Sequence, residues 1–242
     1  MTKSFPTSFA ALAMLIAAPA QANELRDDLA ADMPGLMELY RDLHANPELS
    51  FEEHETAAKL AARMRDLGFE VTEKVGRTGV VSVMRNGDGP TVLLRADMDG
   101  LPVDERSGLE YASQARQVGQ DGVEYPVMHA CGHDVHITSM VGTAHQLMAM
   151  RDRWSGTLMF VVQPAEERIG GARAMLEDGL YDRFGTPDYA LALHVSADDP
   201  TGTIRGAEGI FASSSDSVNL HVPGVGAQGG SVADVLAANA GG

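Results

Sequence analysis

Residues 156–163 read GTLMFVVQ, an almost continuous apolar run that predicts a β-strand buried on both faces. Residues 134–150 precede it with apolar side chains at helical spacing, and a second helical segment follows at residues 170–180. Another apolar strand, DYALALH, is predicted at residues 188–194. Strands that alternate with helices favour parallel pairing with covered faces. The predicted fold class is therefore α/β: a mixed, largely parallel sheet with helices on both faces.

Two helices are predicted upstream of this alternation. From Pro34, leucine and tyrosine side chains share one helical face until Pro47, where proline prevents the helix from continuing. A second helix is predicted to begin near Ser50, because its spacing to Glu53 is that of a capping box. Gly68 suits the left-handed residue just past the end of that helix.

Three β-like runs follow the two helices. They read FEVTEKV, GVVSVMR and TVLLRAD, at residues 69–75, 79–85 and 91–97. The last two runs flank residues 86–89, Asn-Gly-Asp-Gly, which are typical of a hairpin turn. This part of the chain is therefore predicted to be a helix pair followed by a β-meander.

The composition is that of an acidic globular protein. With 242 residues, 44% of them hydrophobic, the chain is long enough to bury a core and to form one or two domains. Its 34 acidic against 18 basic side chains give a formal charge of −16, which would repel a nucleic acid or an anionic membrane surface. We therefore expect neither as a partner.

The N-terminal segment MTKSFPTSFAALAMLIAAPAQA is typical of a cleavable export signal. Lys3 precedes an apolar stretch at residues 9–18, and the small-residue pattern Ala-Gln-Ala ends the segment. The apolar stretch is too short for an ordinary transmembrane helix. We predict a signal peptide at residues 1–22, a mature chain that begins near Asn23, periplasmic or secreted localisation, and no membrane association after cleavage.

Acidic and histidine side chains follow the predicted strands at the point where each strand ends. Asp97 and Asp99 close one strand and, two residues apart on an extended chain, point to the same side. Glu166 and Glu167 follow the central apolar run, and His194 ends the last strand. Ligands of open α/β sheets bind at the carboxyl ends of the strands. We therefore expect these side chains to share one rim of the sheet.

The stretch MHACGHDVHITSM, residues 128–140, contains the only cysteine of the chain, Cys131. One cysteine cannot form an internal disulfide, so a buried inert thiol, an intermolecular crosslink, a nucleophile and a metal ligand all remain open. Cys131 and His133 can serve one centre only from an extended segment or a tight turn, which Gly132 allows. Asp134 suits the N-cap of the following helix, and a sulfur near a helix N-terminus is favoured as the thiolate.

Thiolate, imidazole and carboxylate together are the ligand set of zinc or a similar divalent metal. The adjacent side chains of Glu166 and Glu167 are expected to point in different directions. One of them can then bind metal, while the other stays off the metal as a general base for water. The reaction that this arrangement favours is amide hydrolysis.

Each of these side chains also has a purely structural interpretation. The glutamate pair could be a solvated helix start, Asp97 and Asp99 could form a turn, and His194 could hydrogen-bond a backbone carbonyl. His129 and His136 are expected at most to support metal ligands. Four further histidines are treated as structural: His44, His54, His145 and His221. The metal site is favoured because several independent segment ends would otherwise all have to carry metal-ligand residues by coincidence.

Three longer motifs occur in a fixed order: LRADMDGLPVDE at residues 94–105, MHACGHDVHITSMVGTA at 128–144 and QPAEERIGGARAMLEDGL at 163–180. Together they resemble the aminoacylase-like metal-dependent amidohydrolases, which include hippurate hydrolase and the plant indole-3-acetic acid amino-acid conjugate hydrolases. The resemblance extends from about Leu36 to about Asn219. It implies a zinc-exopeptidase-like catalytic domain.

The resemblance also implies roles for the residues of the motifs. Glu166 would be the general base that activates water and then protonates the leaving amine, and Asp99 would be the active-site aspartate. The implied metal ligands are Cys131, His133, Glu167 and His194. The implied cofactor is a divalent metal, as two ions of zinc, manganese, nickel or cobalt. The implied substrates are small N-acyl amino acids such as hippurate, in which an amide joins an acyl group to an amino acid with a free carboxylate.

The C-terminal region departs from this family pattern. In the family a lid or dimerisation domain interrupts the catalytic domain, and a return segment then supplies another ligand histidine. Residues 224–235 read GVGAQGGSVADV where the family has a Gly-Gly-His-Gly-like motif. We therefore predict residues 23–212 as the N-terminal portion of the catalytic domain and residues 213–242 as the truncated start of an α+β lid. A homodimer is expected only with a complete lid, and the departure also leaves open an inactive metal-binding remnant or interaction module.

Overall fold

A computed structural model describes residues 9–206 and 208–209 of the 242-residue chain. The chain divides into two compact units, residues 1–196 and 197–242, and every helix and strand among the described residues lies in the first. In chain order these elements are α1 (Phe9–Ala45), α2 (His54–Asp66), β1 (Glu70–Val75), β2 (Gly79–Asn86), β3 (Thr91–Asp97), β4 (Arg116–Val118), β5 (Glu124–Pro126), α3 (His133–Ala149), the 3-10 helix η1 (Arg151–Arg153), β6 (Gly156–Gln163), α4 (Gly171–Glu177), α5 (Leu180–Phe184) and β7 (Tyr189–Ala192).

A five-stranded sheet in the order β1-β2-β6-β3-β7 forms the centre of the first unit. The apolar strand β6 lies in the middle, antiparallel to β2 and parallel to β3. At the two edges, β1 pairs antiparallel with β2 and β7 pairs parallel with β3. The sheet is mixed, as predicted, and its parallel half contains the strands that alternate with helices.

The predicted hairpin between β2 and β3 is wrong. β6 lies between these strands, because Val162 is opposite Val80 of β2 and also opposite Ala96 of β3. A strand that is apolar on both faces is most fully buried at the centre of a sheet, where both of its edges are paired. Burial of β6 therefore outweighs the local turn preference of residues 86–89.

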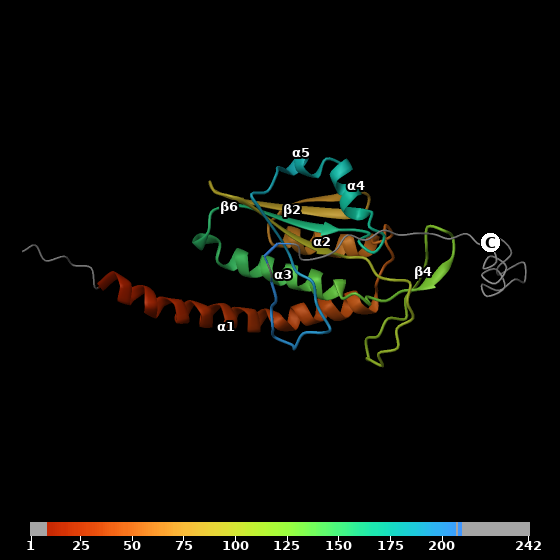
Figure 1. The fold of residues 1–242 in the computed structure, drawn as a ribbon, viewed down its shortest axis with the longest axis horizontal. Coiled ribbons are helices and arrows are strands. Elements are labelled where there is room, and N and C mark those ends of the chain that lie inside the picture. The colour runs from red at the N-terminus through yellow and green to blue at the C-terminus, as the bar shows by residue number, and fades with distance from the viewer. Residues whose placement is uncertain (1–8, 207, 210–242) are drawn as a thin grey trace, which may run out of the picture. The chain divides into compact units, whose positions relative to one another are not determined.

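Helices cover both faces of the sheet, as predicted (Figure 1). α1, α2 and α3 lie on one face, around a buried cluster that includes Leu60 and Phe160. α4 and α5 lie on the other face, where the cluster includes Met159 and Met175. Successive residues of β6 point into opposite cores, which explains why its sequence is apolar without alternation.

The capping box predicted for α2 is wrong. Ser50 and Glu53 are both buried, and their side chains bond to residues on other elements. The carboxylate of Glu48 instead accepts hydrogen bonds from the backbone amides of Glu55 (3.1 Å) and Thr56 (2.7 Å). The cap thus comes from further upstream, because tertiary contacts use the two residues that the local pattern assigned to it.

Other helix ends agree with the sequence only in part. α1 ends at Ala45, and Gly68 after α2 has a φ of 87°, both as predicted. The N-cap of α3 is Gly132 and not Asp134. The Asp134 carboxylate shares a 2.6 Å hydrogen bond with the buried ring of His44, so a tertiary partner again replaces the predicted local one.

β7 is a strand, as predicted, but it is not buried. It forms one edge of the described sheet, and its side chains Tyr189 and Leu191 are 63% and 58% exposed. The sequence DYALALH is typical of an interior strand, yet no described element covers the outer edge of β7.

Two of the predicted segments fall at the ends of the chain. Residues 1–8 and 210–242 lie outside the described residues, so the lid at 213–242 and the role of His221 are still predictions. Cleavage of the export signal is also still a prediction; its residues 9–22 belong to α1. Among the described helices, none combines the length and the apolar character that crossing a membrane requires.

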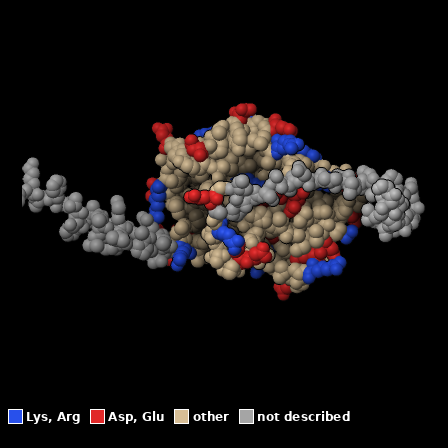
Figure 2. All heavy atoms as spheres, viewed as in Figure 1, with Lys and Arg blue, Asp and Glu red and all other residues tan. Residues whose placement is uncertain are grey.

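The surface charge is dispersed on the face seen in Figure 2, where single Lys and Arg side chains are interspersed with Asp and Glu. This face therefore carries charges of both signs, in a chain whose formal charge is −16.

Candidate metal centre

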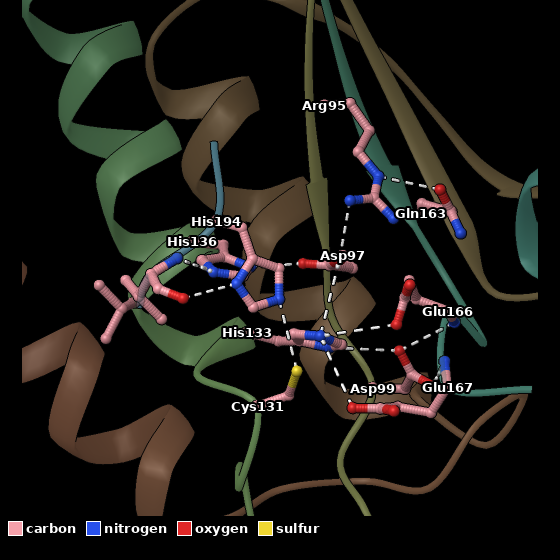
Figure 3. A network of polar contacts seen from close by, with 12 residues as sticks. Arg95, Asp97, Asp99, Cys131, His133, His136, Gln163, Glu166, Glu167 and His194 are labelled. Atoms are coloured by element: carbon pink, nitrogen blue, oxygen red, sulfur yellow. Dashed lines mark hydrogen bonds and ion pairs between the residues drawn. The ribbon is translucent and has the colours of Figure 1, made fainter. Parts of the chain in front are cut away.

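Several segment ends meet at one edge of the sheet (Figure 3). β3 and β6 run parallel, so that Asp97 lies opposite Gln163, and the chain continues from β6 into Glu166 and Glu167. β7 also runs parallel to β3 and leads directly to His194. Parallel strands end at the same edge, and the structure accordingly brings these side chains together with the start of α3.

His133, the first residue of α3, lies at the centre of this group and is fully buried. Its Nε2 is 3.8 Å from Glu167 Oε1 and 3.9 Å from Glu166 Oε2. Its Nδ1 is 3.4 Å from Asp99 Oδ1. Neither ring nitrogen makes a hydrogen bond of good geometry to a described residue. Buried imidazole nitrogens are normally satisfied, so both nitrogens of this ring are available to a ligand such as a cation.

Cys131 and His194 form the outer side of the group. Cys131 Sγ is 3.4 Å from Nε2 of His194, and the other ring nitrogen of His194 donates to the carbonyl of Val195 (2.6 Å). That bond leaves Nε2 as the nitrogen available to a ligand. The donor atoms of Cys131, His133 and His194 all lie within 4.8 Å of one another.

The thiol of Cys131 is not favoured as the thiolate, contrary to the prediction from the helix N-terminus. Burial raises its pKa to about 12, and the charges of Glu167, Glu166 and Asp97 act in the same direction. Burial and the nearby carboxylates together therefore outweigh the helix. A thiol in this state is a poor nucleophile by itself, whereas a cation between sulfur and carboxylates would offset the charges that contribute to the raised pKa.

The glutamate turn, residues 164–171, carries Glu166 and Glu167 on a tightly curled backbone. Their amides donate to the two oxygens of Asp99, at 3.0 Å and 3.1 Å, and the Ser50 hydroxyl donates to Asp99 as well (2.6 Å). The expectation that the two glutamates diverge is wrong, because both carboxylates face His133. They converge because the turn is not extended: Ala165 has a φ of 44°.

Asp97 and His136 form a second layer of the site; the sequence predicted the one as a carboxylate on the shared rim and the other as a supporting histidine, but not the bond between them. The ring of His136 bonds to Asp97 Oδ1 through Nδ1 (2.6 Å) and accepts from the amide of Val195 through Nε2 (3.0 Å). Both nitrogens of His136 are therefore occupied, which fits the supporting role expected for it. Burial acts to raise the pKa of Asp97, but His136, His133 and Arg95 outweigh it and lower the pKa to about 2. The spacing of Asp97 and Asp99, two residues apart on an extended strand, is the sequence feature that places Asp97 on the same side as the site.

The remaining histidines have different surroundings. His129 is buried, burial lowers its pKa to about 4, and its nitrogens have no hydrogen-bond partner among the described residues. His44 lies between Asp134 and Glu105, at 2.6 Å and 3.0 Å, and so has partners that its sequence context did not reveal. His54 and His145 are peripheral to the group.

The donor set fits a divalent metal. Sulfur, imidazole and carboxylate ligands suit zinc and related ions. Three overlapping sets bring metal-ligand atoms within 4.8 Å of one another, and all of them share His133: Cys131 with His133 and His194, Asp97 with His133 and His136, and His133 with Glu166 and Glu167. In the second set both nitrogens of His136 already have partners. The buried Oε1 of Glu167, like the nitrogens of His133, has no hydrogen-bond partner among the described residues. A cation would satisfy all of these atoms.

Comparison with known proteins agrees with this geometry. Residues 93–223 match the model of peptidase family M20/M25/M40. The thermostable carboxypeptidase 2 of Saccharolobus solfataricus is 38% identical over 85% of this chain and 50% of its own length. The hippurate hydrolase of Campylobacter jejuni is 40% identical over 82% of this chain and 49% of its own length. The chain thus spans about half the length of the curated relatives it matches.

A solved structure has a similar fold. A Bacillus subtilis protein described as a dinuclear metal binding peptidase from the M20 family superposes with a TM-score of 0.66 at 37% identity, over 74% of this chain and 48% of that protein. The family match covers more than half of the present sequence and includes every proposed ligand. The chain belongs to peptidase family M20/M25/M40.

Proposed function

We propose that this protein is a metal-dependent amidohydrolase that cleaves N-acyl amino acids such as hippurate. The observation that carries the proposal is the buried ring of His133, whose unbonded Nε2 faces the carboxylates of Glu166 and Glu167 beside the thiol and imidazole of the same group. A site of sulfur, nitrogen and oxygen donors next to a second free carboxylate suits hydrolysis by an activated water.

The residues would divide the work in the following way. Cys131, His133, Glu167 and His194 would hold divalent cations, as two ions of zinc, manganese, nickel or cobalt. Such ions supply water of lowered pKa and an electrophile for the amide oxygen. Glu166, whose backbone is bonded to Asp99, would take the proton from the attacking water and deliver it to the leaving amine.

The substrate class is supported by the relatives and by a cavity beside the site. One relative is named for hippurate and another is a carboxypeptidase; both names fit an amide whose nitrogen belongs to an amino acid with a free carboxylate. A cavity of about 280 Å³ is lined by Glu167 and Arg168, together with Ser50 and Tyr125. We assign Arg168 to the carboxylate of the substrate, because a guanidinium pairs with it in two parallel hydrogen bonds.

We also propose that the protein is exported to the periplasm or the medium. The support is the sequence pattern of residues 1–22, with its basic start, apolar stretch and small-residue end.

The decisive experiment is hydrolysis of hippurate by the full chain loaded with Zn²⁺ or Mn²⁺, followed as glycine release. We expect turnover that a chelator abolishes, and Glu166→Gln should lower kcat by about 100-fold or more while the bound metal remains. Turnover without metal, or an unchanged rate in Glu166→Gln, would contradict the proposal.

The carboxylate assignment has its own test. Arg168→Gln should raise the KM for hippurate about tenfold but not the KM for its neutral amide, hippuramide. Arg173, exposed on α4, provides a matched control, and Arg173→Gln should change neither value. An equal effect of Arg168→Gln on the KM of both substrates would show that Arg168 does not bind the substrate carboxylate.

A second candidate is metal binding without turnover. The observation in its favour is that the proposed ligands all lie within residues 131–194, whereas half the length of the relatives has no counterpart in the match. A chain that binds stoichiometric metal tightly yet releases no glycine with any of the four metals would establish this alternative.

A further inference from the structure

The glutamate turn is held by two buried carboxylates, of which only Asp99 belongs to the site described above. The amide of Ala165 donates to Glu53 Oε1 (2.8 Å), and the next two amides of the turn donate to Asp99 (3.0 Å and 3.1 Å). Three successive backbone N–H groups therefore end on carboxylates that come from the start of α2 and the end of β3.

Glu53 is not required by its own helix. It is the N-cap residue of α2, but its side chain makes no capping hydrogen bond, and Glu48 caps the helix instead. The second oxygen of Glu53 accepts from the hydroxyl of Thr78 (2.5 Å), in the turn between β1 and β2. The carboxylate thus connects the glutamate turn to two other elements of the fold.

The position of Glu53 is unfavourable for a charged group. Its side chain is 0% exposed. The Thr78 hydroxyl and the Ala165 amide, which donate hydrogen bonds to its two oxygens, are both neutral groups. Burial raises the pKa of Glu53, and the hydrogen bonds oppose that shift. A carboxylate buried without a cation destabilises a fold, so its presence indicates that the contact it makes is needed.

The backbone at Ala165 needs such a contact. Its φ of 44° lies in the left-handed region, which a residue with a side chain adopts only when its surroundings enforce it. The carbonyl of Ala165 also accepts from the amides of Gly170 (3.2 Å) and Gly171 (3.1 Å), so this one residue closes the whole turn.

We propose that Glu53 is a positioning residue of the metal centre, which fixes the backbone at Ala165 and thereby directs Glu166 and Glu167 toward His133. Asp99 holds the second half of the turn and Glu53 the first. The inference rests on the proposed metal site, because its consequence is the geometry of a metal ligand.

The test compares metal binding by three variants with that of the full wild-type chain, by competition with a chromogenic chelator for Zn²⁺ and by the absorption spectrum of the Co²⁺-loaded protein. Glu53→Ala should weaken Zn²⁺ binding about 10- to 100-fold and alter the Co²⁺ spectrum. Glu53→Gln keeps an acceptor for Ala165 and can donate to Thr78, so it should bind within about threefold of the wild type.

Glu48→Ala is the matched control, because it removes a carboxylate from the same region without touching the glutamate turn. It should lower the melting temperature by a few degrees and leave the Zn²⁺ affinity and the Co²⁺ spectrum unchanged. If Glu53→Ala does not fold, Glu53→Asp replaces it; its shorter side chain cannot span both Thr78 and Ala165, so about tenfold weaker binding is expected.

The outcomes separate this inference from the proposed function. No Zn²⁺ binding by the wild type would refute the metal site itself. Wild-type affinity in folded Glu53→Ala or Glu53→Asp, or an equal loss in Glu48→Ala, would show that Glu53 only stabilises the fold, while the metal site stands.

Discussion

The proposed ligands come from three regions, and two of these, the glutamate turn and the exit of β7, are held by the fold to very different degrees. The glutamate turn is packed under α4, and three of its successive amides are bonded to buried carboxylates. The exit of β7, residues 192–195, leaves an exposed edge strand. Beyond the strand pairing of Ala192, it is held by the bond from the Val195 amide to His136 (3.0 Å) and by the contact of His194 with Cys131 (3.4 Å). His194 itself is exposed, whereas His133 is fully buried.

This difference indicates which part of the site exists before a cation binds. His133 and Glu167 are already oriented by the fold, so their contribution to affinity includes little ordering. His194 sits on a strand with few neighbours, and such segments open locally at low free-energy cost. A bound cation would therefore stabilise the β7 exit more than the glutamate turn.

The largest expected effect comes from filling the space beneath the glutamate turn. A Cβ on Gly171 would lie 1.5 Å from the carbonyl oxygen of Pro164, a backbone atom that cannot move aside cheaply. Gly171→Ala should lower the free energy of unfolding by about 4 kcal/mol or more in urea titrations. Gly35→Ala in α1, where nothing lies within 4 Å, is the control and should be neutral or slightly stabilising. A Gly171→Ala protein as stable as the control would mean that the turn is not tightly packed.

Truncation of one apolar side chain in the strand that leads into each region compares the packing of the two strands directly. Met159 of β6 is fully buried, whereas Leu191 of β7 is 58% exposed. Met159→Ala should cost about 3 kcal/mol of unfolding free energy and Leu191→Ala less than about 1 kcal/mol. Similar losses at the two positions would show that something covers β7 in solution.

Removal of one imidazole from the buried part of the metal site and one from its exposed part compares what the two parts contribute to metal binding. His133 belongs to every candidate ligand set, so His133→Ala should weaken Zn²⁺ binding by about 100-fold or more, equivalent to about 2.7 kcal/mol. His194→Ala leaves the sets around Asp97 and Glu167 intact and should cost about tenfold. Chelator competition measures both values. A greater loss from His194→Ala would place the metal on the exposed side of the group.

The pH dependence of stability tests whether buried hydrogen bonds hold the start of α3 as they hold the glutamate turn. Burial acts to lower the pKa of His44, but the hydrogen bonds that the ring makes to Glu105 and Asp134 outweigh it and raise that pKa. A raised pKa means that the protonated form is favoured in the folded state, so the contribution is complete below about pH 6.5 and is lost as the pH rises through the folded-state pKa.

The free energy of unfolding of the wild type should therefore exceed that of His44→Gln by about 1 kcal/mol near pH 6. This difference appears as a higher melting temperature, and the melting temperatures of the two proteins should converge at higher pH. A difference that grows with pH would mean that His44 is held in the neutral form.

Local patterns predicted the elements well wherever a residue's preference is not contested. The end of α1 before Pro47, the left-handed Gly68 and the apolar strand β6 follow from backbone geometry and hydrophobicity alone. The predictions that depended on partners failed: the caps expected at Ser50 and Asp134, and the hairpin at residues 86–89. In each case the residues of the predicted local motif bond instead to residues that are distant in the sequence.

The same division holds for the metal centre. The amino-acid sequence by itself determined which donors are available and that they follow strand ends, because residue type and periodicity are local properties. Only the tertiary structure decided that His133 is the shared member, that both glutamates face it, and that the thiol of Cys131 has a raised pKa. Those features depend on which buried groups lie within a few ångströms of one another, and sequence spacing does not encode such distances.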